Sequence, residues 1–250
     1  MSFKAAKCPY CDGDIQVPDN RDTVKCMYCG NDIVVREAIK LAGGVSVENL
    51  LILADAALEA DNNSEAYNYY TKTLEHDPTN YRAWYGKAIS AGWQSTLDNI
   101  RLSETITGFE NAIKYAPQDN KGELKKVCSS SLNVLCYALY RSAWDAFHSH
   151  MTEKSYKKWL DRMDLIIKTR LIASNYNPED KEVLDSICSS YQAILMDHTT
   201  KAYLNDFVKT TNPRDIHYIP FHLSEDQFDK KRKELLEITL VQNSMTQRCL

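Results

Sequence analysis

The sequence is poor in the residues and patterns from which many enzymes build their active sites. It has 8 glycines and 7 prolines in 250 residues. It contains no glycine-rich loop that would cradle a phosphate and no turn motif that would present a nucleophilic serine. No nucleophile, base and orienting residue can be assembled from its spacing. We therefore expect a protein that is not an enzyme.

The chain also lacks a surplus of basic residues and a long apolar run. Its formal net charge is -4, and affinity for nucleic acids comes mainly from lysines and arginines that displace counterions. The longest apolar stretch, residues 49–58, is interrupted by Asp55 and is too short to cross a bilayer. No apolar signal segment follows the first residues. We therefore expect a cytoplasmic protein with no membrane segment, for which nucleic acid is not the expected partner.

Cysteine is present in a pattern that binds metal. Two Cys-x-x-Cys pairs are separated by fourteen residues, and they consist of Cys8, Cys11, Cys26 and Cys29. In a reducing compartment such pairs indicate a metal site rather than disulfides. Two redox-active pairs are the alternative, but the surrounding sequence lacks the βαβ context of a thioredoxin-type motif. Four thiolates complete the tetrahedral shell of a structural site, so we expect one structural zinc ion.

The residues around these cysteines are typical of short strands. Three segments rich in β-branched residues are predicted as strands: 15–17, 23–25 and 33–35. We expect the fourteen residues between Cys11 and Cys26 to form one hairpin and the third strand to follow Cys29. The spacing and the strands resemble the zinc ribbon found in transcription factors and in many bacterial proteins of mixed function. Three further cysteines lie in apolar helical patterns and are predicted to act as small apolar side chains: Cys128, Cys136 and Cys188.

The composition changes near residue 40, where a helical period replaces the strand pattern. We assign residues 1–40 to the zinc ribbon, 41–47 to a linker, 46–210 to helical repeats, and 211–250 to a loop and a C-terminal capping helix. Ser224 and Gln227 form a capping box that predicts the start of the last helix. That helix would cover the exposed end of a stacked array, although a helix that forms a dimer would have the same sequence pattern.

An internal repeat is visible within the helical region. A small residue lies five positions before a proline in three segments: Thr73 and Pro78, Ala112 and Pro117, Ala173 and Pro178. The small residue lets two helices approach, and the proline ends one helix and opens the next. The pattern predicts helix pairs at 48–60/64–76 and 80–93/98–116, then longer helices at about 121–150 and 153–176. We expect Ala54, Ala66, Ala88 and Ala112 at close helix crossings.

This arrangement resembles the tetratricopeptide repeat over about residues 46–210. Two features depart from that family: Lys87 stands where an apolar residue is expected, and Pro78 and Pro117 are 39 residues apart instead of about 34. The resemblance implies a mainly α fold, an α-helical solenoid of antiparallel helix pairs that follows a small N-terminal β zinc ribbon.

The resemblance also implies an interaction scaffold with a concave face formed by the first helix of each pair. An unidentified protein or peptide would bind there, and the residues expected to be partly exposed on this face are Leu51, Asp55, Tyr85, Ile89 and Trp93. The residues with which some family members grip acidic chaperone tails are absent at the corresponding positions. The alternative is a nucleic-acid-associated regulator that uses the ribbon as its contact module. The six basic and six acidic residues within residues 1–40 count against it.

Overall fold

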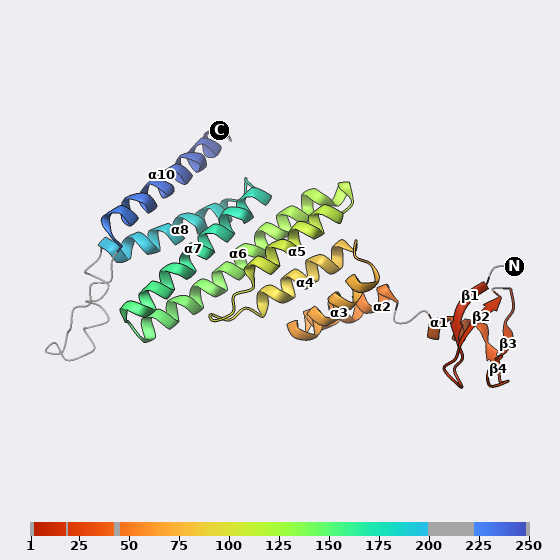
Figure 1. Cartoon of the computed structure of the whole chain (residues 1–250). Coiled ribbons are helices and arrows are strands. Elements are labelled where there is room, and N and C mark those ends of the chain that lie inside the picture. Colours follow the sequence, from red (N-terminus) through yellow and green to blue (C-terminus); the bar gives the residue numbers. More distant parts are fainter. Residues whose placement is uncertain (1–2, 19, 43–45, 200–222, 249–250) are drawn as a thin grey trace. The chain divides into compact units, whose positions relative to one another are not determined.

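The computed structural model describes residues 3–18, 20–42, 46–199 and 223–248. The described chain is mainly helical, with short antiparallel strands near its N-terminus (Figure 1). It divides into two compact units, Met1–Pro78 and Thr79–Leu250. Among the described residues, no helix combines the length and the apolar character that crossing a membrane requires. Part of the predicted linker, residues 43–45, and most of the predicted loop, residues 211–222, lie outside the described residues.

The ribbon consists of two small hairpins. The strands are β1 (Phe3–Lys7), β2 (Asp14–Pro18), β3 (Thr23–Lys25) and β4 (Asp32–Val34). β1 pairs antiparallel with β2, and β3 pairs antiparallel with β4. The prediction of one hairpin between Cys11 and Cys26 is therefore wrong. β2 and β3 both lie in that segment, but they do not pair with each other. β2 pairs with β1, which precedes Cys8, and β3 pairs with β4, which follows Cys29. Strand β1 was missed because none of its five residues is β-branched.

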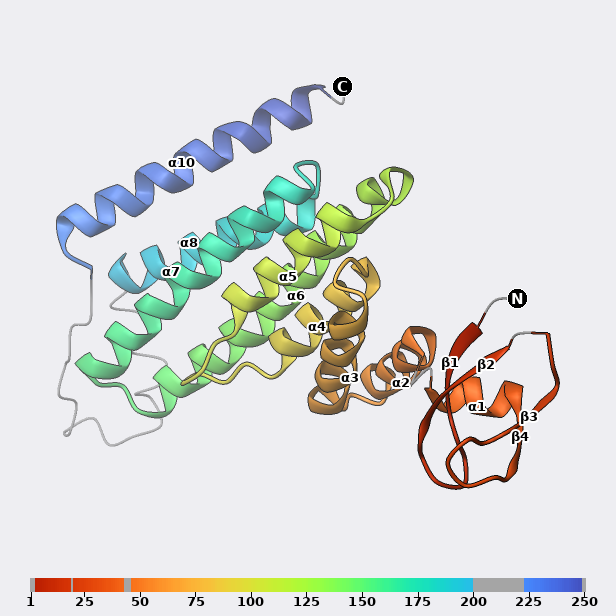
Figure 2. The same cartoon turned by 45° about the vertical axis from the view of Figure 1, so that its right-hand side comes forward.

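A short helix, α1 (Val35–Ala42), completes the ribbon and packs against β1 and β2 (Figure 2). Its residues Val35 and Ala38 are 4% and 0% exposed. The sequence had predicted a strand up to Val35 and a linker from residue 41. The segment forms a helix because Val35 and Ala38, three positions apart, lie on one helix face that is buried against the strands. The ribbon core consists of few residues: Ala6, Cys8, Ile15, Val17, Cys26, Ile33, Val35 and Ala38.

The first helix pair, α2 (Val47–Glu59) and α3 (Asn63–His76), lies within the first unit and agrees with the prediction to within one residue. Each helix starts at a side chain that caps a free amide: Ser46 Oγ accepts from the Asn49 amide at 3.1 Å, and Asn62 Oδ1 accepts from the Glu65 amide at 3.3 Å. The expected crossing residues Ala54 and Ala66 are both 0% exposed.

The second unit is a series of helices that lie alongside one another (Figures 1 and 2). They are α4 (Tyr81–Trp93), α5 (Leu102–Tyr115), α6 (Gln118–Ser149), α7 (Glu153–Tyr176), α8 (Lys181–Thr199) and α10 (Glu225–Arg248). α4 packs on α5, α6 on α7, α7 on α8, and α8 on α10. The predicted helices 80–93, 98–116, 121–150 and 153–176 agree with α4 to α7 to within four residues.

The crossing of α4 and α5 depends on small residues, as predicted. Ala88 is 1% exposed and Ala112 is 0% exposed. Gly108 lies so close to Ala88 that a Cβ atom added to the glycine would be 2.6 Å from the Ala88 Cβ. A side chain larger than hydrogen at Gly108 would therefore force the two helices apart.

The last described helix, α10, begins at the predicted capping box. The Ser224 amide donates to Gln227 Oε1 at 3.1 Å, and the Gln227 amide donates to Ser224 Oγ at 3.3 Å. The helix is fixed to its neighbours by polar contacts: Tyr191 of α8 donates to Glu234 Oε2 at 3.0 Å, and Lys231 Nζ lies 2.7 Å from Asp164 Oδ1 of α7. The 3% exposure of Tyr191 fits a helix that covers the end of the bundle.

Candidate metal centre

The four cysteines predicted as metal ligands come together at the turns of the two hairpins. All four Sγ atoms lie within 4.8 Å of one another. The two shortest separations connect one hairpin to the other: Cys8 Sγ to Cys29 Sγ is 3.6 Å, and Cys11 Sγ to Cys26 Sγ is 3.7 Å. In the part of the chain that the structure describes, no other group of three or more His, Cys, Asp or Glu side chains is close enough to hold an ion.

The two hairpin turns have the same backbone hydrogen bonds. The amide of the first cysteine in each pair donates to a carbonyl five residues later: Cys8 to Gly13 at 3.0 Å, and Cys26 to Asn31 at 2.9 Å. The carbonyl of that cysteine accepts from the amide four residues later, at 2.9 Å in the first turn and 3.0 Å in the second. Each turn thus bends the backbone so that both of its thiols point to the same place.

Both turns require an unusual backbone conformation at one position. The residue after the second cysteine, Asp12 in one turn and Gly30 in the other, has a φ of 57° and 74° respectively. Glycine adopts this left-handed region without a steric penalty, and aspartate is among the residues that tolerate it best. The sequence therefore places suitable residues where the turn reverses.

The similarity of the turns reflects an internal repeat of eighteen residues. Seven of the eleven residues from Lys7 to Val17 are identical to those from Lys25 to Val35. The shared positions include both cysteines, a tyrosine between them, and the Asp-Ile that starts the returning segment. The prediction of a single hairpin did not use this repeat, which indicates two equivalent hairpins.

Two of the four thiols have pKa values that are shifted in opposite directions. The pKa of Cys26 falls to about 6 because its sulfur accepts hydrogen bonds from the amides of Cys29 and Tyr28. The amide of Gly13 favours the Cys11 thiolate, but partial burial and the neighbouring thiols together raise the pKa of Cys11 to about 12. The crowded sulfurs therefore resist carrying their charges together. A bound cation would remove that resistance.

The sulfur positions fit tetrahedral coordination. Metal–sulfur bonds of about 2.3 Å in a regular tetrahedron place the sulfurs about 3.8 Å apart. The separations of 3.6 and 3.7 Å are close to that value, and none exceeds 4.8 Å. Protein sulfur fills all four positions, which is the arrangement of a structural site rather than a catalytic one, where one position stays open for water or substrate.

A scan against protein-family models finds no model that matches this chain, and a search of the curated proteins finds no matching sequence. The functional interpretation therefore depends on the residues and their geometry.

The remaining described cysteines do not form a second cluster. Cys128 and Cys136 of α6 are both 0% exposed, and burial raises the pKa of each thiol to about 12. Cys188 of α8 is half-buried, and burial also raises the pKa of its thiol. The enclosed thiols of Cys128 and Cys136 act as small apolar side chains, in agreement with the prediction, whereas Cys188 is not fully in the core.

Of the residues predicted to be partly exposed on a binding face, the structure buries some and exposes others. Leu51 and Ile89 are 3% and 9% exposed, so the expectation that they are partly exposed is wrong. α4 buries five consecutive residues, Ala88 to Gly92. A helix enclosed on several sides has no single buried stripe from which its exposed face can be deduced.

The other three predicted residues are partly exposed, as expected. Asp55 accepts a hydrogen bond from the Tyr70 hydroxyl at 2.6 Å. Tyr85 stacks on Phe109 with ring centroids 5.4 Å apart, and its hydroxyl lies 3.2 Å from Ser131 Oγ of α6. Trp93, at the end of α4, is 45% exposed.

Three exposed apolar side chains on α6 were not among the residues predicted to form a binding face. Val127, Val134 and Tyr137 are 39%, 47% and 56% exposed. Their spacing of seven and three residues places them on one side of the helix, around Ser131, which Tyr85 contacts. The signal was present as a second apolar stripe beside the buried one, but in a helix of 32 residues both stripes can be mistaken for core.

Proposed function

We propose that the ribbon holds one structural zinc ion between its two hairpins. The support is the donor set: four thiols from two matching turns, at separations that suit tetrahedral zinc. Eight residues form the ribbon core, too few to stabilise about forty residues by burial alone. Zinc binding, with apparent free energies of ~10–16 kcal/mol in small zinc domains, would supply the missing stability.

We further propose that the helical part is a tetratricopeptide-like scaffold that binds a peptide or protein segment. The observation that carries this proposal is the apolar face of α6 formed by Val127, Val134 and Tyr137, next to the half-exposed Tyr85. We call these four residues the α6 face. Soluble proteins seldom leave aromatic and branched apolar side chains grouped in water unless another surface covers them.

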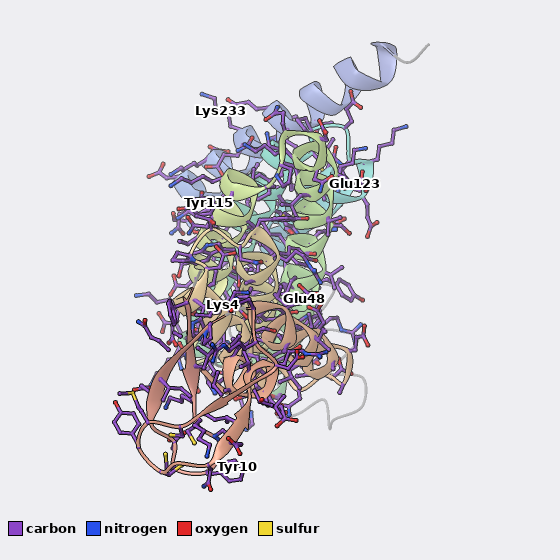
Figure 3. The ribbon with its side chains drawn as sticks, turned by 90° about the vertical axis from the view of Figure 1, so that its right-hand side faces the viewer. Lys4, Tyr10, Glu48, Tyr115, Glu123 and Lys233 are labelled. Carbon is purple, nitrogen blue, oxygen red and sulfur yellow. The ribbon has the colours of Figure 1, made fainter. Side chains whose placement is uncertain are left out.

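The ribbon supports the same kind of function. Tyr10, Met27 and Tyr28, which lie between the cysteines of each pair, are 65%, 78% and 65% exposed. Figure 3 shows Tyr10 projecting from the end of the ribbon, with sulfur atoms drawn nearby. Exposed aromatic residues on a ribbon without a surplus of basic residues suit contact with protein better than contact with phosphates. The nucleic-acid alternative therefore receives no additional support.

The scaffold proposal is tested by comparing two variants in the native cell. Val134→Asp places a charge in the α6 face, whereas Leu236→Asp makes the same change at a residue of α10 that is 55% exposed and outside that face. Neither side chain is buried, so both variants should keep the wild-type melting temperature. Cross-linking, affinity capture and quantitative mass spectrometry would measure the associated proteins.

We expect Val134→Asp to lower the recovery of a specific set of proteins at least about tenfold, the effect of roughly 1.4 kcal/mol in binding free energy. Leu236→Asp should leave that set unchanged. If both variants recover the same proteins as the wild type in the same amounts, the α6 face is not a binding surface and the proposal fails.

A further inference from the structure

A cavity of about 470 Å³ lies between α6, α7 and α8, within the second unit. Its lining comes from all three helices and combines aromatic side chains with charged and hydroxyl side chains. The side chains that matter for its chemistry are Tyr137, Tyr140, Arg170, Glu182, Asp185 and Ser189. A cavity of this volume suits a small molecule better than a folded partner.

Arg170 is the unusual residue of this cavity. It belongs to α7, is 4% exposed, and donates only to neutral acceptors. Its Nε donates to Asn133 Oδ1 at 3.1 Å, and its Nη1 donates to the Ser186 carbonyl at 3.0 Å and to the Ser190 hydroxyl. Among the residues that the structure describes, no acidic side chain forms an ion pair with Arg170. Its three hydrogen bonds use Nε and Nη1, which leaves Nη2 available to another acceptor.

A buried guanidinium in this state is costly to the folded protein. Arginine is rarely buried without an acidic partner, because removing its charge from water is only partly offset by neutral acceptors. The pKa of Arg170 responds accordingly: burial lowers it, and the ionisable neighbours Cys136 and Tyr140 oppose that effect. A carboxylate in the cavity could accept from the unused Nη2 and neutralise the charge, since carboxylates match the planar guanidinium.

The rest of the lining restricts the kind of anion that would fit. Glu182 brings a negative charge to the cavity beside the positive charge of Arg170, which disfavours a doubly charged anion such as phosphate. Glu182 is exposed, and no side-chain partner of its carboxylate is found in the described part of the chain. We propose that this cavity binds a small zwitterion, which places its carboxylate on Arg170 and its cationic group near Glu182.

The test uses three small probes of similar length that carry different charged groups. L-lysine has a carboxylate and cationic groups, hexanoate keeps the carboxylate without a cation, and cadaverine keeps the cations without a carboxylate. The Nε–Hε signal of Arg170 in a ¹⁵N-labelled sample reports on the guanidinium directly. We expect L-lysine to shift this signal saturably, hexanoate to do so with about 2- to 5-fold weaker affinity, and cadaverine to leave it unchanged.

Replacing Arg170 would also break its bonds to Asn133 and Ser186, so the decisive variant is Glu182→Gln. This change should weaken the affinity for L-lysine about 2- to 5-fold and leave the affinity for hexanoate unaffected. Glu179→Gln, an exposed residue outside the cavity lining, is the matched control and should change neither affinity.

Three results would overturn the proposal. They are the absence of any saturable shift with L-lysine up to about 20 mM, an equal shift with cadaverine, and an unchanged L-lysine affinity in Glu182→Gln. The first would mean that Arg170 only connects the three helices. This outcome would not affect the scaffold proposal, which depends on the α6 face.

Discussion

At the scale of single residues, the clearest physical constraint is the close approach of α4 and α5. Gly108 of α5 faces Ala88, and Gly92 of α4 faces Leu135 of α6. A Cβ atom at Gly92 would lie 2.5 Å from a Leu135 methyl carbon, the end of a flexible side chain. At Gly108 the neighbour is the Cβ of Ala88, with the backbone behind it at 3.3 Å, and it cannot move independently of its helix.

The first prediction follows because the Leu135 side chain can move away from an added atom, whereas the Cβ of Ala88 cannot. Gly108→Ala should overpack the crossing and destabilise the second unit by roughly 1–3 kcal/mol. Gly122→Ala is the control, because a Cβ at Gly122 of α6 meets no atom within 4 Å. There, alanine should stabilise the helix by about 0.5–1 kcal/mol through its better helix propensity.

Urea denaturation of the two variants and the wild type measures both effects in one experiment. An unchanged or higher unfolding midpoint for Gly108→Ala would mean that the two helices lie farther apart than in the structure. The same result would remove the basis for the small-residue repeat that the sequence shows at Ala112 and Pro117.

At the scale of elements, the ribbon and the helices of the second unit draw their stability from different sources. Under the zinc proposal the ribbon depends on four thiols, whereas α4 to α8 bury large side chains such as Phe109, Leu132, Trp159, Ile166 and Ile187, each at most 2% exposed. Removing one thiol should therefore affect the ribbon selectively.

The second prediction is that Cys26→Ser abolishes metal binding and unfolds the ribbon while most of the helicity remains. The physical reason is that three sulfurs with one hydroxyl hold zinc far less well than four thiolates, and the ribbon core is too small to compensate. Far-UV circular dichroism and metal analysis provide the measurements. Cys188→Ser, at a thiol outside the cluster, should keep both the metal and the spectrum. Loss of most helical signal in Cys26→Ser would show that the helices need the ribbon to fold.

The third prediction concerns α10. A variant that ends at residue 199 lacks α10, the helix that covers Tyr191. It therefore loses the hydrogen bond between Tyr191 and Glu234 and the ion pair between Lys231 and Asp164. The ion pair is partly exposed and contributes little, but re-exposing a buried aromatic should cost about 1.5–3 kcal/mol. Thermal unfolding followed by circular dichroism would detect this loss, and Leu236→Asp should not show it. If the shortened variant melts at the wild-type temperature, α10 does not stabilise the bundle.

The sequence predicted the helices better than the ribbon, for physical reasons. Long amphipathic helices repeat their apolar period many times, and Ser224 and Gln227 signal a boundary through chemistry that is local. β1 and α1 were missed because their conformations depend on partners: β1 exists through pairing with β2, and α1 through burial of Val35 and Ala38. The cysteine cluster was predictable because each turn is local. The α6 face and the Arg170 cavity were not, because both depend on which helices become neighbours.

At the scale of the whole molecule, the chain combines a small ribbon that brings four cysteines together with a larger helical bundle that has its own core. The ribbon exposes Tyr10 and Tyr28, and the bundle exposes the α6 face. No catalytic arrangement was expected from the sequence, and the proposed metal has no open coordination position. We have proposed that both parts bind protein partners, with the helices held in shape by burial and the ribbon by zinc.

The metal content of the native protein tests the central claim most directly. Protein purified without chelators under reducing conditions, then analysed by inductively coupled plasma mass spectrometry, should contain about one zinc per chain. Cys26→Ser prepared in parallel should contain almost none. If the wild-type protein contains neither zinc nor iron while its ribbon is folded, the four cysteines do not form a metal centre, and the source of the ribbon's stability must lie elsewhere.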